Sequence, residues 1–358
     1  MNDGGMPTPS DGGPQAAASA KKIGTIPQLA GGASVTGFVA DGDGVVMTVL
    51  SSSGPERLVA GSPTGQSSTL YTAAAGELFG YPAMDASNVY ITKLDQSAGV
   101  DGLYAVARSV GGTLTPVYTM PSDGSTLLES MAVGTDNIYV VSETRDGATN
   151  ADGGAVDGYA ILAIAKSSGQ SSTVYSAPPG QEIGNFFIDG ASLYWTESDA
   201  NRDNGATVIR LGTIGGATLD AKVVATIAPP SDVMALVETN GTVVGGSLVS
   251  SIGAVDGGTS VVLPGDAGIA SIVGGIFSIP QGASEAMAVT SQSTIPIGVN
   301  PGTIYFNYGT GISAATVTAT GVLAPRPAVT NIFASQMAGD GHGGLYYLVL
   351  GQASLYKL

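Results

Sequence analysis

The residues best suited to chemistry lie in the stretch "TESDANRDNG" (196–205). Asp199, Asn201 and Asp203 stand at alternate positions, and three such oxygen ligands suit a hard cation such as Ca²⁺. Gly205 comes one place later than the glycine of an EF-hand loop, and no glutamate follows at the required distance. Asp, Asn and Gly are also the residues of exposed turns. A calcium site and a solvated turn are therefore both open interpretations, and no other cofactor is expected.

Two further stretches resemble this one in composition, "TKLDQSAGVDG" (92–102) and "SETRDGATNADGGAVDG" (142–158). With 196–205 they hold nine acidic residues and three basic ones, Lys93, Arg145 and Arg202. Such a concentration of negative charge favours a binding surface for a protein or a glycan. The residues predicted for this surface are Asp95, Asp101, Asp146, Asp152, Asp157, Trp195 and Glu197.

Trp195 is the only tryptophan, and it stands at the end of an apolar run, directly before the third acidic stretch. It either packs between elements of the core or forms a stacking platform for a ligand. The sequence leaves both interpretations open.

Catalytic residue types are scarce. The chain has no cysteine, which excludes thiolate nucleophiles and cysteine-based metal sites. His342, the single histidine, lies in the glycine-rich stretch "GDGHGG". We expect it in a turn on the face opposite the acidic stretches, which argues against a Ser–His–Asp arrangement. No catalytic residue is predicted.

The three acidic stretches follow three copies of one repeat. "SNVYITKLD", "DNIYVVSET" and "ASLYWTESD" align on Tyr90, Tyr139 and Tyr194. Weaker copies are found at 44–50, 241–247, 275–281, 303–309 and 344–350. A short apolar strand precedes each good copy, and a third strand and a fourth follow it, the fourth represented by "STLYT", "TPVYT" and "STVYS". Four strands in roughly 45–50 residues are the signature of a β-propeller blade.

The ends of the domain predict how the ring closes. The last segment, "ASLYKL" (353–358), matches a third strand, so residues 21–30 can supply the missing fourth strand of the last blade. Seven blades fit the length of the domain, and eight is the alternative, because 268–328 contains more strand-like runs than one blade needs. The expected fold is all-β: a propeller with four-stranded antiparallel blades over residues 21–358.

The segment Tyr194-Trp195-Thr196-Glu197 resembles the Tyr-Trp-Thr-Asp signature of LDL-receptor class B repeats. The chain after residue 20 also resembles the Gly/Thr-rich propeller repeats of bacterial secreted proteins and lipoproteins. Only one copy keeps the tryptophan, and Glu197 replaces the aspartate of the signature. The resemblance implies a non-enzymatic binding propeller and assigns no functional residue.

Composition sets the remaining expectations. The net charge of −16 disfavours nucleic acid and anionic lipid as partners. No apolar run is long enough to span a membrane. Residues 1–20 have the composition of a disordered tether, either an ordinary N-terminus or one that follows a lipoprotein cleavage site. The leading hypothesis is an extracytoplasmic, non-catalytic binding or scaffold propeller. The alternative is a metal-assisted propeller lyase or hydrolase acting at the channel mouth.

Overall fold

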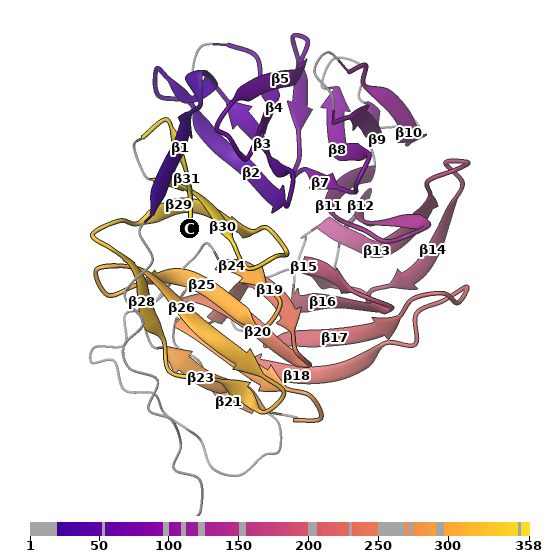
Figure 1. The fold of residues 1–358 in the computed structure, drawn as a ribbon. Coiled ribbons are helices and arrows are strands. Elements are labelled where there is room, and N and C mark those ends of the chain that lie inside the picture. The colour runs from indigo at the N-terminus through magenta and orange to yellow at the C-terminus, as the bar shows by residue number, and fades with distance from the viewer. Residues whose placement is uncertain are drawn as a thin grey trace, which may run out of the picture.

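Seven β-sheets succeed one another around a common centre in the computed structural model (Figure 1). The structure describes residues 20–51, 54–95, 100–108, 112–120, 126–149, 155–199, 206–228, 231–249, 269–271, 275–283, 285–290, 297–349 and 352–358. Each sheet has its first strand nearest the centre, and the chain passes outward through antiparallel neighbours before it enters the next sheet. The protein is therefore a seven-bladed β-propeller, as the repeat predicted.

Blades 1 to 3 follow the predicted pattern closely. Blade 1 consists of β2 (Ser34–Asp41), β3 (Gly44–Leu50), β4 (Arg57–Gly61) and β5 (Ser67–Thr72). Blade 2 has a divided first strand and consists of β6 (Glu77–Phe79), β7 (Ala83–Met84), β8 (Asn88–Asp95), β9 (Val100–Ala107) and β10 (Thr115–Thr119). Blade 3 consists of β11 (Thr126–Val133), β12 (Asn137–Thr149), β13 (Ala155–Ala165) and β14 (Ser171–Ser176).

Blades 4 to 6 carry the additions to the pattern. Blade 4 consists of β15 (Gln181–Asp189), β16 (Ser192–Asp199), β17 (Thr207–Thr213) and β18 (Lys222–Ala228). Blade 5 consists of β19 (Ser231–Thr239), β20 (Thr242–Val249), β22 (Gly275–Pro280) and β23 (Met287–Thr290), and β21 (Ile269–Ser271) pairs in parallel with the outer strand of blade 4. Blade 6 consists of β24 (Ile297–Asn300), β25 (Thr303–Tyr308), β26 (Gly311–Thr318), β27 (Gly321–Val322) and β28 (Arg326–Thr330).

Blade 7 joins the two ends of the propeller. It consists of β29 (Ala334–Gly339), β30 (Leu345–Val349), β31 (Ser354–Lys357) and β1 (Lys21–Thr25). Strand β1 pairs antiparallel with β31, and Figure 1 shows the two strands side by side. The predicted closure by the 21–30 segment is confirmed. A single 3-10 turn, η1 (Pro27–Leu29), then leads to blade 1, and no described helix has the length or apolar composition needed to cross a membrane.

One weak copy of the repeat proves to be a different strand. Residues 275–281 align in sequence with the second strands, but β22 is the third strand of blade 5. The second strand of that blade is β20, and 25 residues separate β20 from β22. This long connection interrupts the spacing of the repeat, which explains why eight blades were a reasonable alternative.

The first strands are longer than the sequence indicated. β11 begins at Thr126 and β15 at Gln181, whereas the alternation of apolar residues is clear only in their second halves. The register shifts in the middle of these strands, between Leu128 and Met131 and between Ile183 and Phe186. A β-bulge reverses the alternation of side chains, so each half follows a different pattern.

The core consists of apolar clusters between adjacent blades, and the described residues include one such cluster at each of the seven junctions. Successive residues of a second strand point to opposite neighbours because side chains alternate along a strand. In β3, Met47 packs toward blade 7 and Val46 toward blade 2. Every blade therefore needs a neighbour on both faces.

Removal of β1 tests the closure. Deletion of residues 1–25 should lower the melting temperature by roughly 5–15 °C, because it exposes the edge of β31 and loosens the packing around Ile26, which is fully buried. Deletion of residues 1–18 is the control and should leave thermal unfolding unchanged. Equal melting temperatures for the two truncated proteins would contradict the closure by β1.

Candidate functional site

The ends of the second strands meet the entries of the blades on one face of the propeller. The register pairs Glu77 with Asp95, Leu127 with Glu143, and Gln181 with Asp199. The second-to-third-strand loops of blades 2, 3 and 4, which carry the three acidic stretches, therefore open on this same face. We call it the acidic face. The first-to-second and third-to-fourth turns form the opposite face, which we call the turn face.

The predicted site residues differ in how they are placed. Asp95 and Asp199 end β8 and β16 and are partly exposed. Asp101, Asp146 and Asp157 occupy positions in β9, β12 and β13. Three others, Asp152, Asn201 and Asp203, lie outside the described residues. The calcium site at 199–203 therefore stays a prediction.

Blade 3 carries the longest hairpin of the acidic face. β12 has 13 residues and β13 has 11, and their pairing continues to Thr149 and Ala155. The outer strand β14 pairs with β13 only from Ala160 onward. The hairpin therefore continues as a two-stranded ribbon beyond the rest of its sheet, and it contains the positions of Asp146 and Asp157.

Trp195 and Glu197 lie inside the protein. Trp195 is 0% exposed and Glu197 1% exposed, in the core between blades 3 and 4. The indole Nε1 of Trp195 donates to Glu197 Oε1 over 3.1 Å, and the hydroxyl of Tyr175 donates to the same oxygen. Arg210 Nε donates to the second oxygen, Oε2, over 2.5 Å. Neither Trp195 nor Glu197 offers surface to a partner in this fold, so we leave both out of the binding surface.

The same position in blade 2 also holds an ion pair, between two half-buried side chains. Lys93 stands three residues after Tyr90, as Glu197 stands three after Tyr194, and it pairs with Glu77. Its ammonium group lies 4.6 Å from the centroid of the Tyr104 ring. Burial lowers the pKa of Lys93, but the bond to Glu77 and the nearby tyrosines outweigh it and raise the pKa above its usual value. The pair thus joins the first and second strands of blade 2.

Sequence reasoning missed the apolar side chains of the acidic face. Leu50 ends β3, Leu78 lies in β6, Tyr308 ends β25, and Phe333 connects blade 6 to blade 7. They are 39%, 38%, 38% and 48% exposed, respectively. Their positions at strand ends next to polar loops were the only signal in the sequence.

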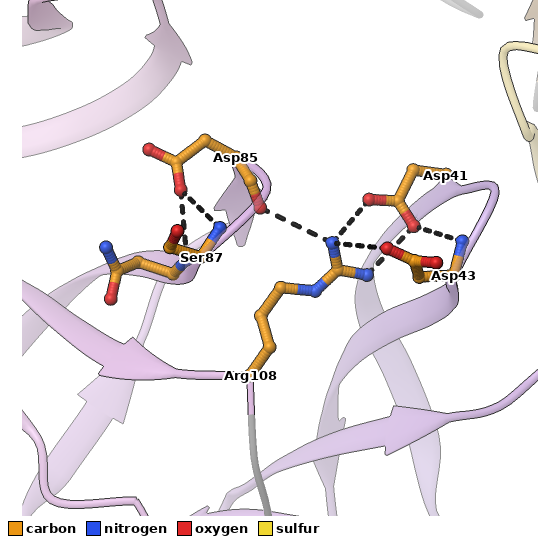
Figure 2. A network of polar contacts seen from close by, with 6 residues as sticks. Asp41, Asp43, Asp85, Ser87 and Arg108 are labelled. Carbon is orange, nitrogen blue, oxygen red and sulfur yellow. Dashed lines mark hydrogen bonds and ion pairs between the residues drawn. The ribbon is translucent and has the colours of Figure 1, made fainter.

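A network of charged residues lies on the turn face (Figure 2). Arg108 of blade 2 donates through both terminal nitrogens to the carboxylate of Asp41 in blade 1, over 2.5 and 2.8 Å. It also donates to the backbone oxygen of Asp85 over 3.4 Å. Lys166 of blade 3 donates to Asp85 Oδ2 over 2.8 Å. The first-to-second turns of blades 1 and 2 are thus each bonded to the next blade by a base of that blade.

Two hollows flank this network, of about 770 and 820 Å³. The smaller one is lined by Asp85, Tyr90 and Lys166, and the larger one by Asp43 and Arg108, among others. Partial burial raises the pKa of Asp85, but the bonds from Lys166 and from backbone N–H groups outweigh it and hold the pKa well below its usual range. Lys166 and Arg108 are thus both engaged in ion pairs.

His342 lies in the turn between β29 and β30, on the turn face, where the repeat predicted it. Its backbone N–H donates to Asp340 Oδ1 over 2.8 Å. Among the described residues, no three His, Cys, Asp or Glu side chains are grouped as a metal site would require. The described part of the chain therefore assigns no residue to the metal-assisted alternative.

Glu238 and Asp189 form a carboxyl pair at the junction of blades 4 and 5. Burial raises the pKa of Glu238, and the hydrogen bond and charge of Asp189 raise it further, to about 7. The backbone N–H of Gly241 donates to Glu238 Oε1 over 2.5 Å and opposes this shift. Near neutral pH Glu238 therefore exists both in a protonated form, which hydrogen-bonds to Asp189, and in an ionised form, which Asp189 repels.

The comparisons agree with the propeller fold. The chain is similar to a prolyl endopeptidase structure (TM-score 0.59, 12% identity; 91% of this chain, 47% of that one). It is also similar to the β-propeller domain of the Trilobed protease from Pyrococcus furiosus (0.56, 8%; 91% and 95%) and to an oligogalacturonate lyase in complex with manganese (0.56, 12%; 94% and 89%). The chain spans about half the length of the prolyl endopeptidase. No family model and no curated sequence matches it.

Replacement of Glu197 tests the buried ion pair. Glu197→Ala should lower the free energy of unfolding by about 3–5 kcal/mol, because Arg210 and the indole N–H lose their acceptor. Asp220→Ala is the control, since its pair with Lys222 is exposed on both sides, and it should change the stability by less than ~1 kcal/mol. Chemical denaturation measures both, and similar values for the two variants would contradict the buried role.

The carboxyl pair predicts how stability changes with pH. Because the pKa of Glu238 is higher in the folded protein than its ordinary 4.5, the folded state binds the proton more tightly. Stability from this pair should therefore be greatest at acidic pH and fall as the pH rises from about 4.5 to about 7. Glu238→Gln should flatten the profile and raise the melting temperature at pH 8. Parallel profiles for the two proteins would refute the assignment.

Proposed function

We propose that this chain is an extracytoplasmic binding propeller that receives a basic polypeptide on its acidic face. The observation that carries the proposal is the coincidence of two features on one face. The acidic stretches of blades 2 to 4 lie on this face. Four exposed apolar side chains lie on it as well, one each from blades 1, 2 and 6 and one from the connection after blade 6. Acidic loops attract positive charge, and exposed apolar residues supply contact area.

The net charge of −16 supports a basic partner. A field of one sign steers an oppositely charged ligand and raises the rate of association, an effect that salt reduces. The three acidic stretches concentrate this field on neighbouring blades. The extracytoplasmic location stays a prediction from the composition of the N-terminal segment.

A polypeptide fits this face better than a glycan. Leu50, Leu78 and Phe333 cannot hydrogen-bond to sugar hydroxyls, whereas they can bury apolar side chains of a peptide. Two of the similar structures are a prolyl endopeptidase and the propeller domain of a protease, proteins that act on polypeptides or accompany such an activity. These likenesses support the choice of ligand class without assigning a catalytic residue.

The second candidate is a metal-assisted lyase or hydrolase that acts at the channel mouth. The similar structures, two of them peptidases or parts of one and the third a lyase with manganese, favour this alternative over a purely structural scaffold. Incubation of the chain with Mn²⁺ and either oligogalacturonate or an unstructured polypeptide tests it. Product formation that scales with protein concentration would replace the binding proposal.

Charge-neutralising variants test the proposed function. Asp95→Asn, Asp146→Asn and Asp157→Asn together should weaken binding of a fluorescent oligolysine peptide about tenfold, at ~0.5 kcal/mol for each exposed ion pair. The control removes three acids of the turn face, by Asp43→Asn, Asp220→Asn and Glu285→Gln, with the same change in net charge. Fluorescence anisotropy at 50 and 300 mM salt gives both affinities.

Weaker binding in the acidic-face variant alone, and at low salt above all, is the expected result. Equal weakening in both variants would indicate attraction by net charge without a site. Preferential binding of a neutral oligosaccharide in the same assay would assign the face to a glycan instead. Either result would overturn the proposal.

A further inference from the structure

A hollow of about 440 Å³ opens on the acidic face at the closure of the ring, between blades 7 and 1. Its walls are the segment 29–35, which leads from η1 into β2, and the ends of β29 and β30 with the residues that follow β30. It is separate from the acidic stretches, which belong to blades 2 to 4.

The lining is apolar or neutral. Leu29, Ala33, Val35, Leu348 and Val349 supply the apolar surface, and no lining residue carries a charge. The polar groups present are serines and glutamines, which are neutral at every pH at which the protein is folded. An apolar ligand group can therefore bind there without displacing water from a charged side chain of the protein, which would cost free energy.

Two glycines form part of one wall of the hollow. Gly31 and Gly32 line it and have φ angles of +79° and +86°, which side-chain-bearing residues rarely adopt. The chain turns at these glycines before it enters β2.

One large apolar side chain lies close in sequence to the lining residues. Phe333 immediately precedes Ala334, whose strand partner Val349 lines the hollow. Phe333 is 48% exposed. Leu50 lies at the neighbouring end of β3, but it alternates with Val49 and points toward blade 2, as Val46 does. An apolar hollow with an exposed apolar residue beside it has the composition of an anchor site for a buried side chain.

We propose that this hollow binds an apolar side chain of the basic polypeptide, with the lysines or arginines of the same polypeptide over the acidic blades. The inference rests on the function proposed above. Blade 1 lies between the hollow and blade 2, and Leu50 of blade 1 and Leu78 of blade 2 are exposed at strand positions on the same face, between the hollow and Asp95. The acidic blades favour a positively charged part of the ligand, and the neutral apolar hollow favours an apolar part. A polypeptide with both kinds of side chain therefore fits this face.

Three synthetic peptides test the inference. Each has about 12 residues, which reach up to roughly 40 Å when extended. The first carries a terminal tryptophan, a Gly-Ser spacer and six lysines, the second replaces the tryptophan by alanine, and the third keeps the tryptophan and replaces the lysines by serines. Burial of the indole should make the first peptide bind about tenfold or more tightly than the second.

Protein variants test whether the difference in affinity between the tryptophan and alanine peptides arises at the hollow. Ala33→Trp fills the hollow, because Ala33 lines it and packs on the core between blades 7 and 1, and this variant should abolish the advantage of the tryptophan peptide. Phe333→Ser should reduce the advantage. Thr115→Trp, on the exposed outer strand of blade 2, is the matched control and should preserve it. The alanine peptide should bind all these proteins equally, and unchanged melting temperatures of Phe333→Ser and Thr115→Trp verify folding.

Equal binding of the tryptophan and alanine peptides to the unaltered protein would overturn the anchor site, as would a tryptophan advantage that survives in Ala33→Trp and Phe333→Ser. Failure of the proposed function has a different signature, namely that the alanine peptide shows no salt-dependent binding. In that case the serine peptide still probes the hollow, and its loss of binding in Ala33→Trp would support the site independently of charge.

Discussion

Each blade of this protein has two apolar faces, and the whole fold depends on covering both. A second strand such as β3 sends Met47 to one neighbour and Val46 to the other, so an isolated sheet would expose half of its apolar side chains. A closed ring covers every face without a free end. The backbone pairing of β1 with β31 supplies that closure, because it makes the first residues of the fold part of its last sheet. The similar propeller domain of the Trilobed protease adopts a different solution, an open velcro topology.

Closure also divides the surface into two faces with different chemistry. The first-to-second turns of blades 1 and 2 form ion pairs with the next blade: Asp41 pairs with Arg108, and Asp85 pairs with Lys166. The charges of these two aspartates therefore stabilise contacts between blades. The second-to-third connections of blades 2 to 4 differ in length and carry the acidic stretches. Surface connections tolerate variation and often carry function, and this is where we place the binding function.

The buried charges show how a repeat can change its role. The position three residues after the aligned tyrosine holds Lys93 in blade 2, Ser142 in blade 3 and Glu197 in blade 4. Lys93 and Glu197 are paired within their own blades, and the fourth-strand tyrosine of the preceding blade, Tyr175, bonds Glu197. Charge of either sign is acceptable at this position when the partner changes with it, because a buried ion left without its partner is strongly destabilising.

The sequence by itself determined the class of fold, the blade spacing and the closing strand, since these follow from alternation, turn residues and a repeat that ends one strand short. It also placed the acidic loops on one face and His342 on the other. Only the tertiary structure decided the third-strand role of 275–281 and the full length of the first strands, because a long connection and mid-strand bulges break the local pattern. Burial of Trp195 and Glu197, and the hollow between blades 7 and 1, depend on contacts between residues of different blades. No local pattern contains that information.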